Sequence, residues 1–158
     1  MQADFDVDIR QIIALARRMT EKEVEGCAKK GVRKALAIMR KPVQSYAKSK
    51  LPHRLGSSGN PLYKDVKMAV WKRPQGQTVA GGSVSLLAPR GKKGKGNRAY
   101  ILRFYNAAPT KRGHLHRFTD MNGFFDRQVR SAKKQAEESL EGLVVKEILK
   151  KANKDGMI

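Results

Sequence analysis

His114 and His116 are the residues whose type and spacing come closest to a metal site in this sequence. Imidazole nitrogens bind zinc and related metals, but a structural zinc site needs four ligands, and these two histidines supply only part of one. We therefore expect both histidines to be ordinary loop residues. The sequence predicts no metal and no other cofactor.

Catalytic groups are also scarce. Between residues 26 and 121 the acidic side chains are Asp65 and Asp120, too few for a two-metal nuclease centre without acids from the chain ends. Residues 91–96 (GKKGKG) lack the residue order of a phosphate-binding P-loop. Cys27 lies on an apolar helical stripe, where a buried thiol is expected rather than a nucleophile. We predict no catalytic residues and no enzymatic activity.

Positive charge is the strongest functional signal in the chain. Its 158 residues include 34 Lys and Arg against 14 Asp and Glu, for a net charge of +20. Residues 26–121 hold 22 of the basic side chains and only two acidic ones, whereas the two flanking segments together carry no net charge. This localised charge indicates a polyanionic partner, either nucleic acid or an acidic protein surface, with solubility alone as the alternative.

Two loops are expected to carry the contacts with this partner. Lys and Arg side chains on exposed loops neutralise phosphates without reading the base sequence. Residues 88–98 are rich in Gly and in charge and predict an exposed, flexible loop, and a second basic loop follows near residue 110. The candidate contacts with DNA or an acidic partner are Arg90, Lys92, Lys93, Lys95, Arg98, Lys111, Arg112 and Arg117.

The elements that must position these loops begin with two helices. Apolar residues at helical spacing predict a short amphipathic helix over residues 8–19. Thr20 and Glu23 form a capping-box pattern that starts a second helix, which runs to about residue 50. Pro42 removes a backbone donor, so we predict a kink or break near residues 38–42. The polar face of this second helix, interpreted as solvated, holds Lys29, Lys30, Arg33, Lys34, Arg40 and Lys41.

A small sheet and a third helix follow. Alternating apolar residues predict strands over residues 66–72 and 78–87, joined as a hairpin. Residues 99–105 are compatible with a buried strand or with one turn of helix. Apolar residues recur every three or four positions from residue 123 to about residue 152, which predicts a long amphipathic helix with an attraction between Glu147 and Lys151.

The order of these elements predicts an α+β fold: a long N-terminal helical region, a small antiparallel β-sheet with long basic loops, and a long C-terminal amphipathic helix. We expect a single domain over residues 1–158, divided into residues 1–51, 62–105 and 123–152. The apolar stripes of the two long helices are expected to pack on the same sheet and form one core. No apolar run is long enough to span a bilayer, and the acidic first residues do not resemble a signal peptide.

This order of parts resembles the small tail-completion, or head-tail joining, proteins in the neck of long-tailed bacteriophages. That family shows a long N-terminal helix, a Thr-Gly-x-Leu turn into a short sheet, a Tyr-apolar-Glu-apolar-Gly-Thr stretch, and an aromatic residue opening a C-terminal helix. Here residues 59–62 (GNPL) stand in the turn, residues 100–105 (YILRFY) in the central stretch, and Phe124 and Phe125 at the last helix. The Thr of the turn is missing, and residues 105–108 (YNAA) replace the end of the central motif.

The resemblance implies a non-enzymatic structural protein of the virion, made in the host cytoplasm. It would form a ring, expected to be a hexamer, that joins the capsid portal and head-closure complex to the tail tube. Its partners would be itself, neighbouring neck, portal and tail proteins, and the double-stranded DNA of the channel, with no membrane. The alternative left open by the charge is a free-standing basic protein that binds nucleic acid without regard to sequence.

Overall fold

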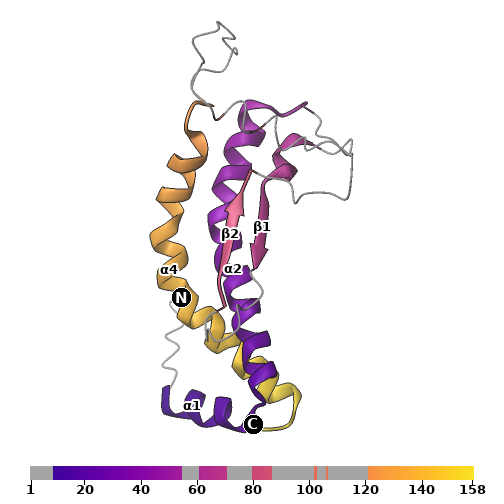
Figure 1. Ribbon diagram of the computed structural model, residues 1–158, viewed down its shortest axis with the longest axis vertical. Coiled ribbons are helices and arrows are strands. Elements are labelled where there is room, and N and C mark those ends of the chain that lie inside the picture. Colours follow the sequence, from indigo (N-terminus) through magenta and orange to yellow (C-terminus); the bar gives the residue numbers. More distant parts are fainter. Residues whose placement is uncertain (1–8, 55–60, 71–79, 87–101, 103–105, 107–120) are drawn as a thin grey trace, which may run out of the picture.

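The structure, a computed structural model, describes residues 9–54, 61–70, 80–86, 102, 106 and 121–158. Its elements in chain order are α1 (Ile9–Arg18), α2 (Glu21–Lys50), the 3-10 helix η1 (Leu62–Asp65), β1 (Lys67–Val70), β2 (Gly82–Ser85) and α4 (Phe124–Lys154). Figure 1 shows α2 and α4 side by side along the molecule, α1 across one end, and the two strands beside α2. The predicted α+β fold, with a long helix before and a long helix after a small antiparallel sheet in the chain, is confirmed.

The corner between α1 and α2 forms as the local sequence predicts. The Thr20 hydroxyl oxygen accepts a hydrogen bond from the Glu23 N–H at 3.4 Å, and the Glu23 carboxylate accepts one from the Thr20 N–H at 3.0 Å. These reciprocal bonds satisfy two backbone donors at the start of α2 and make a complete capping box. The predicted boundary between the first two helices is therefore confirmed.

Helix α2 runs without a break through Pro42, so a break near residues 38–42 is excluded, and a kink there stays a prediction. A proline removes one helical hydrogen bond, which in an isolated helix is enough to end it. Here the residues that follow, Val43 and Ala47, are fully buried. Tertiary packing of this face therefore holds the helix together, as is usual for helices whose stability comes from burial rather than from propensity.

The sheet consists of two antiparallel strands, in which Lys67 pairs with Ser85 and Val70 pairs with Gly82. It packs against α2, and Gly82 of β2 lies close to the helix at this contact. A Cβ on Gly82 would lie 2.4 Å from Cδ1 of Leu36 and 2.6 Å from the carbonyl oxygen of Ala69. Strand β2 thus needs a glycine where it meets the helix.

Most of the buried hydrophobic residues form two clusters rather than one core. The upper cluster joins α2, η1, β2 and the start of α4, and contains Val43, Ala47, Leu51, Leu62, Val66, Leu86, Leu102, Met121 and Phe124. The lower cluster joins α1, α2 and the end of α4, and contains Ile12, Leu15, Met19, Cys27, Ile148 and Ala152. The expectation that both long helices pack on the sheet in one core is wrong, because strands of four residues span only about 13 Å beside helices of about 45 Å. Helix α4 packs mainly along α2 instead.

Asn106 caps the start of α4 from outside the helix. The residue at the N-cap position, Gly123, has a φ of 65° and no side chain to accept a hydrogen bond. The Asn106 side-chain oxygen accepts one from the Phe125 N–H at 2.8 Å, and its carbonyl accepts another from the Gly123 N–H at 2.9 Å. The buried Leu102 has helical backbone, which favours the helical alternative at this position of residues 99–105, and Asn106 just after that stretch is also helical.

Candidate nucleic-acid interface

The basic loops singled out from the sequence lie outside the described residues. This applies to the candidate contacts Arg90, Lys92, Lys93, Lys95, Arg98, Lys111, Arg112 and Arg117, and also to His114, His116 and Asp120. Their proposed roles therefore remain predictions, and the charged surfaces that can be described come from α2 and α4.

Cys27 occupies the interior, as predicted. Its side chain belongs to the lower cluster, and its Sγ donates a hydrogen bond to the Glu147 carbonyl oxygen at 3.5 Å. Burial raises the pKa of the thiol, chiefly by disfavouring the charged thiolate. Cys27 consequently has neither the exposure nor the thiolate character of a nucleophile.

The described part of the chain contains no group of three or more His, Cys, Asp or Glu side chains arranged to hold a metal ion. None of its helices has the length and apolarity that crossing a membrane requires.

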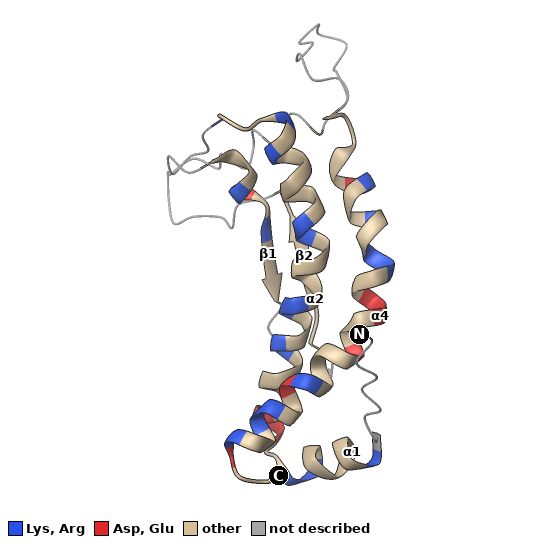
Figure 2. Ribbon diagram, turned by 180° about the vertical axis from the view of Figure 1, so that it is seen from behind, with Lys and Arg blue, Asp and Glu red and all other residues tan. Residues whose placement is uncertain are grey.

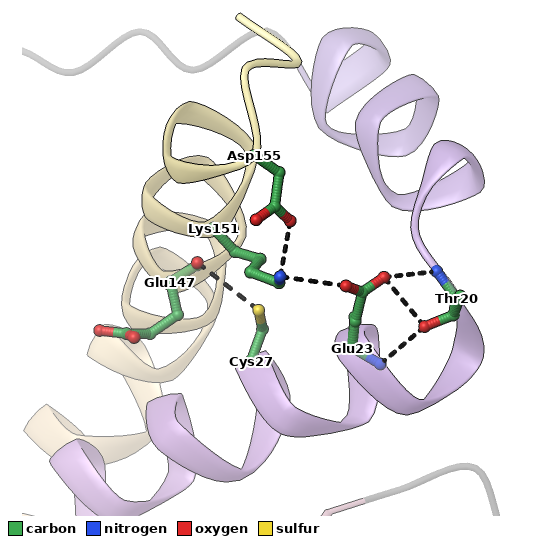
Figure 3. A network of polar contacts seen from close by, with 6 residues as sticks. All are labelled: Thr20, Glu23, Cys27, Glu147, Lys151 and Asp155. Carbon is green, nitrogen blue, oxygen red and sulfur yellow. Dashed lines mark hydrogen bonds and ion pairs between the residues drawn. The ribbon is translucent and has the colours of Figure 1, made fainter.

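The end of the molecule where α1, α2 and α4 meet is closed by a polar network (Figure 3). The Lys151 ammonium lies 3.0 Å from the Glu23 carboxylate and 2.6 Å from that of Asp155. Hydrogen bonds from the Thr20 backbone and from Lys151 lower the pKa of Glu23 to about 2, and the bonds to Asp155 and Glu23 raise the pKa of Lys151. Each charged side chain of this network faces one of opposite sign, with Lys151 between two carboxylates, so we interpret the network as structural.

Glu147 pairs with a different partner from the one its spacing suggests. The expected attraction to Lys151 on the same helix is absent, because Lys151 turns to Glu23 and Asp155 while Glu147 pairs with Lys34 of α2. The Glu147 side chain is buried, and the hydrogen bond from Lys34 is the main cause of its lowered pKa. This pair ties the middle of α2 to the second half of α4.

Beyond Glu25, the exposed side of α2 carries only positive charge. No Asp or Glu occurs between Glu25 and Asp65, so the rest of the helix has no acidic side chain of its own. Figure 2 shows Lys and Arg recurring along α2, with acidic residues confined to its start. We define the basic face of α2 as its exposed cations beyond Glu25, which are Lys30, Arg33, Lys34, Lys41 and Lys48.

Helix α4 differs in that its cations alternate with acids. Lys133 lies 3.7 Å from Glu137 and Lys134 lies 3.8 Å from Glu138, each pair one turn apart and exposed. Such pairs add little stability, but they cancel charge locally. Among the described helices, α2 therefore has the largest excess of positive charge, with nine basic and three acidic residues against eight and five on α4.

A groove of about 530 Å³ runs between α2 and α4 next to the basic face. Its lining is mixed, with the polar residues Lys41, Ser45, Ser131 and Gln135 beside apolar ones such as Pro42. The shape and lining of this open groove show no convergent pair of groups suited to catalysis. It is better regarded as part of the surface that α2 presents.

Comparison of the chain with protein-family models, with curated proteins and with solved structures found no match.

From the sequence alone, the cations of α2 are expected to form a solvated face, and the interface is expected on the loops instead. The available signal was the absence of any acid from residue 26 to residue 64, combined with helical spacing of the basic residues. What sequence spacing could not reveal is which cations are neutralised across the fold, as Lys34 is by Glu147.

Proposed function

We propose that this chain is a structural subunit of the neck of a tailed bacteriophage, a non-enzymatic virion protein. In this role it forms part of a ring, expected to be hexameric, between the portal or head-closure complex and the tail tube. The ring lines or surrounds the channel through which the genomic DNA passes.

One observation carries this proposal. The three places on which the family resemblance rests are the turn at residues 59–62, the stretch at residues 100–105 and the aromatic opening of the last helix. One residue from each, Leu62, Leu102 and Phe124, is fully buried, and all three belong to the upper cluster. Phe124 also stacks on Tyr46 of α2 at 5.5 Å between ring centroids. Residues far apart in sequence thus share a common packing role, which supports reading them as one motif.

The sheet supplies a route to self-association. Within the described residues β1 and β2 pair only with each other, so each strand has an edge that no described strand occupies. Edges of this kind pair readily with strands of a neighbouring subunit, and head-to-tail contacts that close produce rings. Charge opposes such contacts between subunits of net charge +20 until DNA or acidic neighbours screen it.

The second candidate function is a free-standing protein that binds nucleic acid without sequence preference. The uniformly basic face of α2 favours nucleic-acid contact in either case. The two functions can be distinguished by whether the chain occupies a fixed position in the phage particle, because only the first requires an ordered ring.

The test is electron microscopy of phage particles assembled from the genome that encodes the chain, together with mass spectrometry of their proteins. We expect the chain in stoichiometric amounts, as a ring between portal and tail tube. Deleting the gene should leave DNA-filled heads that fail to join tails, and supplying the chain in trans should restore joining. Absence of the chain from the particle, or its presence as a single copy, would exclude the ring.

A further inference from the structure

We propose that the basic face of α2 binds the phosphate backbone of duplex DNA without regard to base sequence. The choice of DNA as the ligand rests on the proposed function, while the surface itself is defined by the fold. This assigns the DNA contact to a rigid helix in addition to the basic loops that the sequence suggested.

The face is a line of cations along one side of the helix. At about 100° per residue, Lys30, Lys41 and Lys48 lie within roughly 20° of one another around the helix axis. Arg33 and Lys34 widen the line to an arc of roughly 100°. From Lys30 to Lys48 the line extends about 27 Å, over which one strand of B-DNA presents roughly eight phosphates.

Several of these cations are available for an external anion. Lys34 is engaged by Glu147, and Lys48 lies 5.7 Å from the centre of the Tyr63 ring. In contrast, none of the ion pairs formed among the described residues includes Lys30, Arg33 or Lys41. All three side chains are exposed. Phosphates would therefore meet cations that need not first break an internal pair.

The composition of the face favours nucleic acid over a protein partner. The centre of a protein interface is typically enriched in aromatic and apolar residues and depleted in Lys. Across the described residues, the large hydrophobic side chains that are exposed are Ile13 and Ile158, and neither lies on α2. A Lys-rich line without an apolar anchor suits a phosphate backbone, where binding comes from release of counterions.

The position of the face in the fold also suits a long, stiff ligand. Helix α2 is anchored along its other side by both buried clusters and by the packing of α4. Its cations are consequently held on one continuous helix of 30 residues. Ordering a duplex against this surface requires no rearrangement of the backbone.

The test compares two triple variants of the full-length chain that change net charge equally. The first is Lys30→Gln, Arg33→Gln and Lys41→Gln on the basic face. The control is Arg130→Gln, Lys133→Gln and Lys134→Gln on α4, where two of the cations have acidic neighbours. Urea unfolding of both verifies that these exposed changes leave the fold intact. The probes are two fluorescein-labelled 30-base-pair duplexes of unrelated sequence, followed by fluorescence anisotropy between 50 and 300 mM salt.

We expect the basic-face variant to bind both duplexes more weakly, by roughly tenfold or more at 100 mM salt, and the control to change much less. The slope of log K against log salt should become shallower by about 0.9 for each phosphate contact removed. Equal losses of DNA affinity in the two variants would show that the basic face acts only through net charge, and would overturn the proposal. So would an unchanged slope, or tight binding of the wild type to polyglutamate but not to duplex DNA.

The outcome is separable from that of the neck proposal. If the chain forms a ring in the particle but the basic-face variant has an unchanged salt slope, the neck function stands and the proposed DNA contact of α2 is rejected. If the chain is absent from particles but binds DNA through α2 in a salt-dependent way, the DNA-binding surface stands and the free-standing nucleic-acid-binding protein is favoured.

Discussion

Gly31 of α2 lies directly against Val144 of α4, at a separation that leaves no room for a side chain. A Cβ added to Gly31 would be 2.5 Å from Cγ2 of Val144 and 3.0 Å from both its Cα and its backbone nitrogen. Since two of these three atoms belong to the backbone, a rotamer change cannot relieve the clash. The two long helices therefore pack at this position only because α2 carries a glycine.

We predict that Gly31→Ala destabilises the protein by about 1–3 kcal/mol, the usual cost of forcing extra volume into a packed contact. Gly26→Ala on the same helix is the matched control, because a Cβ there would meet nothing within 4 Å. The control should be stabilised by about 0.5–1 kcal/mol, since alanine favours the helix. Urea unfolding measures both, and a higher midpoint for Gly31→Ala would contradict the close crossing.

The polar network at the α1–α2 corner predicts a loss of stability in acid. The pKa of Glu23 is about 2 in the folded protein against 4.5 ordinarily, so its carboxylate stabilises the fold above about pH 4.5. That contribution should disappear as the pH falls from about 4.5 to about 2. Glu23→Gln keeps a side-chain oxygen for the capping box but removes the charge facing Lys151.

The measurement is the urea midpoint of wild type and Glu23→Gln from pH 7 to pH 2. The variant should be less stable at pH 7, and the difference should shrink across the acid range. Glu138→Gln is the control, because the exposed pair of Glu138 with Lys134 at 3.8 Å contributes little. A wild-type advantage that stays constant down to pH 2 would show that the Glu23 charge does not contribute.

Sequence reasoning succeeded where the determinants of structure are local. Thr20 and Glu23 are three residues apart, and their capping box follows from side-chain chemistry within one turn. In contrast, the continuation of α2 through Pro42 and the requirement for a glycine at position 31 depend on packing against α4, about a hundred residues further along the chain. Periodicity identifies which residues are apolar, but it does not specify which helix they will contact or how closely.

The cap on α4 provides a third prediction. Asn106→Ala removes the acceptor of the Phe125 N–H and should cost about 0.5–2 kcal/mol, as at other helix N-termini. Asn106→Asp should retain the bond and add a favourable negative charge at the start of the helix. Hydrogen exchange at the first turn of α4 should therefore accelerate in the alanine variant and not in the aspartate variant. Acceleration in neither variant would mean that Asn106 is not the cap.

The same dependence on distant partners limits what could be inferred for the interface. The sequence located the charge excess correctly within residues 26–121, because a count needs no fold. It did not separate Lys34, which is engaged by the buried Glu147, from exposed neighbours such as Lys30. It also did not identify Asn106, because a residue that caps a helix from 19 positions away has no recognisable spacing.

Leu102 and Leu140 test the revised view of the core. Leu102 is fully buried in the upper cluster, whereas Leu140, on the predicted apolar stripe of α4, is only partly buried. Leu102→Ala should lower the free energy of unfolding by about 2–5 kcal/mol. Leu140→Ala should lower it distinctly less, because a partly buried side chain loses fewer packing contacts when it is truncated. Thermal or urea unfolding of the two variants gives the comparison directly. A larger loss for Leu140→Ala would restore the sequence-based core and reject the division into two clusters.

The basic loop at residues 88–98 yields the last prediction, which rests on sequence alone. Its cations repel one another and resist burial, so Lys92→Ala, Lys93→Ala and Lys95→Ala together should leave the urea midpoint almost unchanged. If the loop contacts DNA or an acidic neighbour, the same variant should lower incorporation into particles, DNA retention or both. Combining it with the basic-face variant should reduce the salt slope of DNA binding further, because separate phosphate contacts release separate counterions. A loop variant that assembles normally and retains DNA at every salt concentration would limit the loop to a role in solubility.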